Sequence, residues 1–133
     1  MAQVSGIGGV FVYANAPASL AAWYARHFGL EFRYDEGMQC YYLVFHYRDL
    51  DPPSRLLDTV LAIFPAQEPL GRARGEYMIN YRVDDLDGLV AQLHAAGIKT
   101  TDITVERDEE GYGKFTRLRD PEGNRIELYQ PIR

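Results

Sequence analysis

The feature that most constrains the fold is an internal repeat, in which strand, helix, strand, strand, strand is predicted twice along 133 residues. Each half begins with a β-rich segment and continues into an amphipathic helix that ends at a glycine, Gly29 or Gly97. The closing strands also match, since residues 61–64 and 126–129 share one pattern. Repetition on this scale indicates two copies of one supersecondary unit.

The first half starts with an alternating strand at residues 7–14. Asn15 is predicted to cap the first helix, with Pro17 in its first turn, where the missing N–H does no harm. The apolar stripe of this helix recurs at helical spacing: Leu20, Trp23, Tyr24 and Phe28. The remaining strands are predicted at residues 30–35, 39–47 and 59–64, with a turn at 36–37 and a loop at 48–57.

The second half follows a linker at residues 66–75, which carries two glycines, a proline and the arginines Arg72 and Arg74. We therefore expect one domain, residues 1–133, made of half-modules 4–66 and 76–133. Asp84 and Asp85 are candidate caps of the second helix. Its apolar stripe is Leu86, Leu89, Val90 and Leu93, and its strands are predicted at residues 77–83, 99–106, 112–119 and 125–129.

This pattern predicts an α+β fold of two tandem βαβββ modules, forming a cupped mixed sheet with one helix per module on the outer face. Side chains alternate across a strand, so each strand offers one face to its helix. The predicted helix-covered residues are Val10, Val12, Leu61, Ile63, Ile79, Tyr81, Ile126 and Leu128. The opposite faces mix aromatic and polar residues, as a small-molecule pocket does. The candidate ligand-binding residues there are Phe11, Tyr13, Phe64, Met78, Asn80, Arg82, Glu127 and Tyr129.

The closing segment holds the candidate functional carboxylate. Asp120-Pro-Glu-Gly123 is typical of a tight turn, in which proline presets φ and glycine supplies left-handed geometry. In the strand that follows, Ile126 and Leu128 point to the core, whereas Glu127 points to the other face. Glu127 has three possible roles: an ion-pair partner of Arg82 or Arg125, a ligand-binding group, or a general base.

Composition excludes several classes of function. A net charge of −5 argues against nucleic-acid binding, which depends on clustered Lys and Arg, and is compatible with a cationic small ligand. The sequence shows neither an apolar run long enough to span a membrane nor an export signal, so cytoplasmic residence is the default expectation. The single cysteine, Cys40, allows no internal disulfide and no cysteine-based zinc site.

Three motifs, spread over almost the whole chain, carry a family resemblance: Trp23-Tyr24 with Phe28-Gly-Leu30, Tyr81-Arg-Val-Asp-Asp-Leu86, and Asp120-Pro-Glu-Gly-Asn124 with Ile126-Glu-Leu128. Together they resemble the vicinal oxygen chelate superfamily, which includes glyoxalase I, bleomycin-resistance proteins, fosfomycin-resistance enzymes and extradiol dioxygenases. The resemblance implies paired βαβββ modules, a ligand site inside the cupped sheet, and a homodimer.

Enzymes of this superfamily generally hold a divalent metal with one residue from each of four inner strands. The corresponding positions here are Gly9, Ala62, Met78 and Glu127, of which only Glu127 is a ligand for a hard or borderline cation. One carboxylate is far short of the three or four ligands that catalytic zinc or iron requires. We therefore predict no bound catalytic metal and no cofactor.

The histidines do not restore a metal site, because no pair has ligand spacing on a helix. His27 and His94 lie at the edges of the helix stripes and are interpreted as partly buried or surface imidazoles. His46 lies near the end of a strand that can aim it into the cavity, where it would be an acid or base.

Two functions remain. The first is a metal-free binding protein of the bleomycin-resistance kind, holding a small aromatic or cationic molecule against tyrosine and phenylalanine side chains. The second is a glyoxalase-like lyase or isomerase, in which Glu127 moves a proton next to a carbonyl and Arg82, Asn80 or a tyrosine hydroxyl replaces the metal. Loss of three of the four ligand positions favours the first, because the metal-dependent chemistries use the metal to stabilise negative charge.

Overall fold

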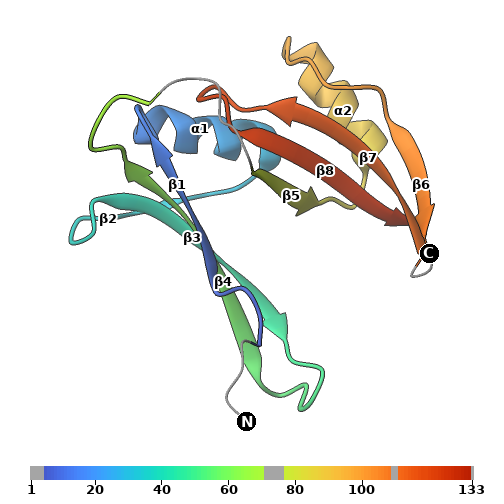
Figure 1. The fold of residues 1–133 in the computed structure, drawn as a ribbon, viewed down its shortest axis with the longest axis horizontal. Coiled ribbons are helices and arrows are strands. Elements are labelled where there is room, and N and C mark those ends of the chain that lie inside the picture. Colours follow the sequence, from blue (N-terminus) through green and yellow to red (C-terminus); the bar gives the residue numbers. More distant parts are fainter. Residues whose placement is uncertain (1–4, 71–76, 109–110, 133) are drawn as a thin grey trace. The chain divides into compact units, whose positions relative to one another are not determined.

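The structure, a computed structural model, describes residues 5–70, 77–108 and 111–132. Its helices and strands follow the predicted order (Figure 1): β1 (Gly9–Ala14), α1 (Pro17–Phe28), β2 (Arg33–Asp35), β3 (Cys40–Arg48), β4 (Leu56–Pro65), β5 (Met78–Arg82), α2 (Leu86–Ala95), β6 (Thr104–Asp108), β7 (Gly111–Arg119) and β8 (Arg125–Ile132). The predicted α+β class with two tandem βαβββ modules is confirmed.

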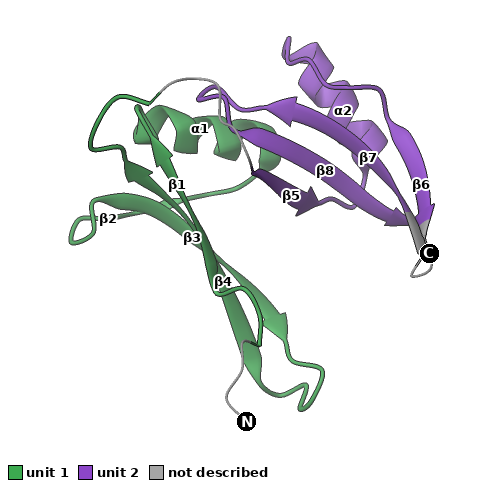
Figure 2. Ribbon diagram, in the orientation of Figure 1, with its two compact units in different colours: residues 1–70 green, residues 71–133 purple. Residues whose placement is uncertain are grey.

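The chain forms two compact units, Met1–Leu70 and Gly71–Arg133, which Figure 2 colours separately. Each unit holds one four-stranded mixed sheet, and the strand order is the same in both: β1-β4-β3-β2 and β5-β8-β7-β6. In each sheet the first and last strands of the module pair in parallel, and the other pairs are antiparallel. The exact limits predicted for the half-modules stay a prediction, and residues 71–76 of the predicted linker lie outside the described residues.

In the first unit, α1 packs against β1, β3 and β4. Its buried residues include Leu20 and Tyr24, and the predicted stripe on the strands supplies Val12, Leu61 and Ile63, each at most 5% exposed. Burying each large apolar side chain contributes roughly 1.5–3 kcal/mol. The alternation therefore orients β1 and β4, which leaves Phe11 and Tyr13 on the face away from these core residues.

In the second unit, α2 packs against β8. Leu86, Val90 and Leu93 of the helix are buried, as are Ile126 and Leu128 of the strand. Asp85 caps this helix as predicted, because its Oδ1 accepts a hydrogen bond from the Gly88 amide at 3.0 Å. Within the described residues, neither helix is long and apolar enough to cross a membrane.

The prediction that Asn15 caps α1 is wrong. Ala16 is the N-cap residue and makes no side-chain cap. The Asn15 side chain instead binds the backbone of Leu70, accepting from its amide at 2.8 Å and donating to its carbonyl at 3.0 Å. Asn15 thereby ties the chain just before α1 to Leu70, the last residue of the first unit, which lies 55 residues further along the sequence.

Several strand limits also differ from the prediction. β4 begins at Leu56 rather than residue 59, because Asp49 and Arg55 close a short loop through an Asp49 N–H to Arg55 O bond of 2.9 Å. β2 is shorter than expected and β8 runs on to Ile132. β6 begins at Thr104 rather than residue 99. At Thr101 the backbone amide donates to the Arg117 carbonyl, but the Arg117 amide donates to the Thr101 hydroxyl instead of to its carbonyl, so the regular strand pairing is interrupted there.

Candidate functional site

A buried polar turn between β7 and β8 fixes the register of the site. Asp120 is 5% exposed, and its Oδ1 accepts hydrogen bonds from the amides of Glu122 and Asn124, both at 2.9 Å. Gly123 takes a φ of 89°, the left-handed conformation expected at this position. The predicted turn therefore forms, and its carboxylate satisfies backbone donors that burial would otherwise leave unpaired.

Asn124 ties the same turn to the chain just before β5. Its side chain is 1% exposed, donates to Asp120 Oδ2 at 2.7 Å, and accepts from the Tyr77 hydroxyl at 2.8 Å. A buried amide that satisfies partners on both sides is rigid, because each broken bond leaves a desolvated group. The turn thus aligns the start of β8 with β5 as well as with β7.

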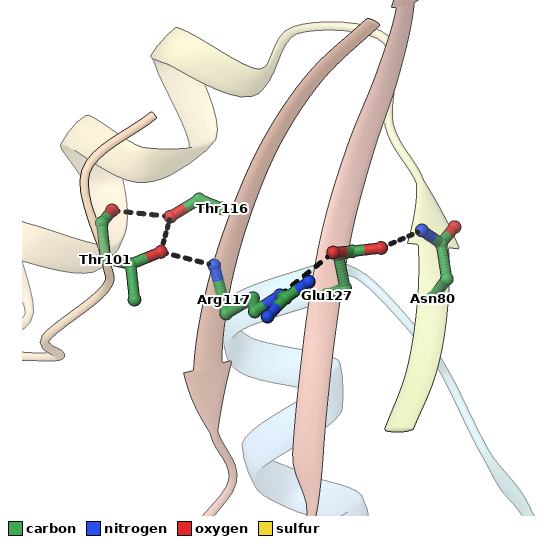
Figure 3. A network of polar contacts seen from close by, with 5 residues as sticks. All are labelled: Asn80, Thr101, Thr116, Arg117 and Glu127. Atoms are coloured by element: carbon green, nitrogen blue, oxygen red, sulfur yellow. Dashed lines mark hydrogen bonds and ion pairs between the residues drawn. The ribbon is translucent and has the colours of Figure 1, made fainter. Parts of the chain in front are cut away.

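The position of Glu127 follows from this register. It lies opposite Asn80 of β5 and opposite Arg117 of β7. Asn80 Nδ2 donates to Glu127 Oε1 at 2.9 Å, and Arg117 Nε donates to Glu127 Oε2 at 3.0 Å (Figure 3). The Glu127 side chain is 13% exposed. Each carboxylate oxygen therefore accepts one hydrogen bond from a neighbouring strand, and these two bonds fix the orientation of the Glu127 side chain.

The backbone of Arg117 is itself held in place. The Arg117 amide donates to Thr101 Oγ1 at 2.9 Å, and Thr101 N–H donates to the Arg117 carbonyl at 2.9 Å. Thr116, 1% exposed, adds a hydroxyl bond to the Thr101 carbonyl at 2.6 Å. As Figure 3 shows, one line of contacts runs from Thr101 through Arg117 and Glu127 to Asn80.

The ion-pair role of Glu127 was predicted with the wrong partner. Arg82 and Arg125 are on its face, but the residue that binds it is Arg117, which the sequence analysis did not single out. The sequence of the turn already contains the signal that identifies Arg117 as the partner of Glu127. Pairing outward from residues 120–124 in an antiparallel hairpin sets Arg117 opposite Glu127.

The four positions that correspond to metal ligands do not fit a metal. Gly9 is packed so closely that a Cβ would lie 2.9 Å from the Val60 carbonyl oxygen and 3.2 Å from the Phe11 ring. Ala62 is 2% exposed, and Met78 offers only a thioether, a soft ligand. Among the described residues, no group of three or more His, Cys, Asp or Glu side chains is close enough together to hold a metal.

An aromatic pair lies further along the open face of the second sheet, the face on which Arg117 and Glu127 lie. Phe115 and Tyr129 are cross-strand partners whose rings stack 5.0 Å apart. Gly113 makes room for the Tyr129 ring, because a Cβ there would lie 2.5 Å from its Cε1. Arg82 is the exposed neighbour of Tyr129 on β5. Five of the predicted site residues thus share this sheet: Met78, Asn80, Arg82, Glu127 and Tyr129.

The other predicted residues form an aromatic cluster on the first sheet. The Phe64 ring lies 5.5 Å from that of Phe11 and 5.8 Å from that of Tyr13. Phe11 is 58% exposed and Tyr13 is 53% exposed, which is unusual for large aromatic side chains. The three rings therefore lie together on one face of the first sheet, while their role as ligand contacts stays a prediction.

His46 is on the same face and has an acidic partner. Its Nδ1 lies 2.7 Å from Asp58 Oδ1, and both side chains are more than half exposed. The other two histidines lie on the helices: the ring of His27 contacts Trp23, and His94 Nε2 lies 2.9 Å from Thr100 Oγ1. Arg72 and Arg74, in the predicted linker, lie outside the described residues.

The sequence of this chain is similar to that of a known protein family. The glyoxalase-like domain family matches residues 9–129, which is nearly the whole chain. The chain belongs to the glyoxalase-like domain family. This membership confirms the resemblance to the vicinal oxygen chelate superfamily.

One curated relative of this glyoxalase-like chain is a 4-hydroxyphenylpyruvate dioxygenase from Caenorhabditis briggsae. It is 32% identical over 127 residues, an alignment that covers 82% of the chain and 29% of the dioxygenase. The chain therefore spans less than a third of that relative's length.

Solved structures of diverse proteins share the fold. A virulence protein from Salmonella typhimurium has a TM-score of 0.72 at 14% identity, covering 98% of this chain and 100% of its own. An antibiotic-binding protein from Streptomyces sp. CB03234 has a TM-score of 0.65 at 21% identity, with coverages of 99% and 100%. A lactoylglutathione lyase from Agrobacterium tumefaciens has a TM-score of 0.62 at 22% identity, with coverages of 96% and 95%. At such identities the likeness concerns the fold alone.

Proposed function

We propose that this glyoxalase-like protein is a metal-free small-molecule-binding protein of the bleomycin-resistance kind. Its ligand contacts are the open-face residues of the sheets, taken sheet by sheet: Phe11, Tyr13 and Phe64 on the first, and Met78, Asn80, Arg82, Glu127 and Tyr129 on the second. Aromatic surface with a few fixed polar groups is the usual lining of a small-molecule site.

The observation that carries the proposal is the bonding of Glu127. Of the four family ligand positions it alone has a carboxylate, and both its oxygens accept hydrogen bonds, from Asn80 and Arg117. A group held in this way suits the recognition of a polar ligand atom, because the network fixes its orientation in advance. The antibiotic-binding protein that shares the fold supports a binding role as a precedent for such use.

The competing function is proton transfer next to a carbonyl, with Glu127 as the base and no metal. The bonds from Asn80 and Arg117 weigh against it, because they hold the carboxylate as an acceptor within the sheet and leave only its remaining lone pairs for a substrate proton. The lactoylglutathione lyase that shares the fold keeps this alternative open to test.

The test is a thermal-shift screen of small molecules with and without EDTA, repeated on Glu127→Gln. A ligand that binds only the folded protein raises its Tm. We expect ligands whose Tm increase is insensitive to EDTA, and for a neutral apolar ligand an affinity within a few fold of wild type in Glu127→Gln. Turnover of a glyoxalase-type substrate that Glu127→Gln abolishes would replace binding with the lyase or isomerase function.

We further propose that the protein is a cytoplasmic homodimer that binds neither nucleic acid nor membranes. The net charge of −5 opposes binding to phosphate backbones. Light scattering should give about twice the chain mass of 15.2 kDa at micromolar concentration. A mass of one chain under these conditions would contradict the dimer.

A further inference from the structure

The second unit contains a cavity of about 380 Å³ that is open to solvent and whose charged lining is entirely basic. Lys99, Arg117, Arg119 and Arg125 line it, and no acidic side chain does so among the described residues. Four positive charges around one cavity contrast with the net charge of −5 for the chain. From this arrangement we infer that the cavity binds the anionic group of the ligand, a carboxylate or a phosphate.

Three of the four basic side chains are exposed, and two of them keep hydrogen-bond donors for a ligand. Lys99, Arg117 and Arg119 are exposed, and Arg125 is half-buried. Lys99 has no hydrogen-bond or ion-pair partner among the described residues, and the side chain of Arg117 donates to Glu127 through Nε alone. The Nη groups of Arg117 and the ammonium of Lys99 therefore keep donors for an oxyanion, and a guanidinium can bind one through two parallel bonds.

Two anchors hold the basic residues at the cavity. Arg119 Nη1 donates to the Gly123 carbonyl at 2.8 Å, which ties it to the buried turn. The hydrogen bonds between Thr101 and Arg117 bring the segment after α2, and with it Lys99, beside β7. A guanidinium fixed in advance, as that of Arg119 is, favours an anion because less ordering is needed when it binds.

The cavity continues the face on which Glu127 lies. Met78, Arg125 and Arg119 form one cross-strand row, and Asn80, Glu127 and Arg117 form the next, about 7 Å along the strands. Arg117 lines the cavity and also binds Glu127. A ligand with its oxyanion in the cavity can therefore extend past Glu127 toward the stacked rings of Phe115 and Tyr129.

The inference rests on the proposed function, because the body of the ligand would contact the residues named there. It changes the expected ligand from a cation to an anion. The net charge alone favours a cationic ligand, whereas the local charges of the cavity favour an anion. Met78 adds apolar surface to the lining, whereas the side chains of Leu118 and Ile126, 7% and 1% exposed, offer almost none. An organic oxyanion with an apolar body matches this lining better than a free inorganic ion does.

The test uses three probes of one shape, benzoate, benzamide and benzamidine, with inorganic phosphate as a fourth. Binding is followed by amide NMR at low ionic strength. We expect benzoate to shift the amides of Thr101 and Arg117 and to bind about tenfold more tightly than benzamide, as one charge-assisted contact predicts. Benzamidine should leave these amides unshifted. A tighter Kd for phosphate than for benzoate would identify a phosphate as the anionic group, and the reverse a carboxylate.

The variant Lys99→Gln removes one exposed charge from the cavity, and Arg33→Gln removes one exposed charge from the first sheet as the matched control. Benzoate affinity should fall several-fold in Lys99→Gln, stay unchanged in Arg33→Gln, and weaken with added salt. Equal binding of benzoate and benzamide, no saturable shift with either benzoate or phosphate, or an unchanged affinity for the anion in Lys99→Gln would each overturn the inference.

These outcomes are separate from those of the proposed function. If benzamide binds as well as benzoate and shifts Asn80 and Tyr129, the anion assignment fails and the binding function stands. If benzoate binds as expected but Glu127→Gln abolishes a measured turnover, the anion assignment stands and the metal-free binding function fails.

Discussion

Arg117 and Glu127 face each other on neighbouring strands, and Arg117 Nε donates to Glu127 Oε2 at 3.0 Å. The carboxylate side chain is 13% exposed, whereas that of Arg117 is 58% exposed. The pair therefore has one shielded partner and one that reaches solvent. Glu127 is the position to which the family resemblance assigns a metal ligand, and in this chain it is held as an ion pair.

A double-mutant cycle with Arg117→Gln and Glu127→Gln should measure a modest coupling. Because Arg117 is largely solvated, we expect about 0.5–1 kcal/mol, at the upper end of the range for exposed pairs. Urea unfolding of the four proteins gives the free energies. Additivity of the two changes within experimental error would show that the pair does not stabilise the fold.

The close packing of Gly9 gives a second prediction. Gly9→Ala should destabilise the protein by roughly 1–3 kcal/mol, because its Cβ would lie 2.9 Å from the Val60 carbonyl oxygen. Gly8→Ala is the matched control, since a Cβ there meets no atom within 4 Å. We expect the control to change the free energy of unfolding by less than about 0.5 kcal/mol. Equal effects of the two substitutions would contradict the packing at Gly9.

The buried turn gives a third prediction. Asp120→Ala should cost about 2–4 kcal/mol, because it leaves the amides of Glu122 and Asn124 buried without their acceptor. Asp102→Ala, at an exposed position, serves as the control. Thermal unfolding monitored by circular dichroism compares the two. A Tm for Asp120→Ala as high as that of the control would exclude a structural role for the Asp120 carboxylate.

Much of this architecture can be predicted from sequence because it depends on local pattern. The alternating pattern that includes Val12, Leu61 and Ile63 determines which face of each strand is buried. The residue types at Asp120 and Gly123 determine the turn. The structure shows both features as predicted. These signals depend on residues within a few positions of one another.

The features that the sequence analysis missed depend on contacts between distant segments. Asn15 has the residue type of a helix cap, but it binds the backbone of Leu70 instead. Lys99 and Arg117 meet at one cavity only because Thr101 joins β7 outside a regular strand. Neither partner can be inferred from local periodicity. The Arg117–Glu127 pair is different, since its register follows from the hairpin turn.

Cys40 gives a prediction about pH. It is 4% exposed, and burial, followed by the negative charge of Asp35, raises the pKa of its thiol. Below the pKa of the unfolded thiol both states are neutral, so Cys40 adds no pH dependence there. As pH rises further the unfolded thiol ionises first, and stability falls until the folded thiol also ionises.

Labelling of Cys40 tests this directly. At mildly alkaline pH, a thiol reagent should react slowly with the folded protein and quickly in denaturant, because the thiolate is the reactive form and burial limits access. The denatured protein is the control for the intrinsic rate. Equal rates in the two states would show that the thiol is neither buried nor raised in pKa.

The measurement that tests the central claim most directly is metal analysis of the purified protein, paired with the variant Glu127→Ala. Elemental analysis follows dialysis against zinc, iron, nickel and manganese in turn. We predict far less than one metal per chain, and no difference between wild type and Glu127→Ala. Near-stoichiometric metal that is lost in Glu127→Ala would contradict a metal-free binding site at Glu127.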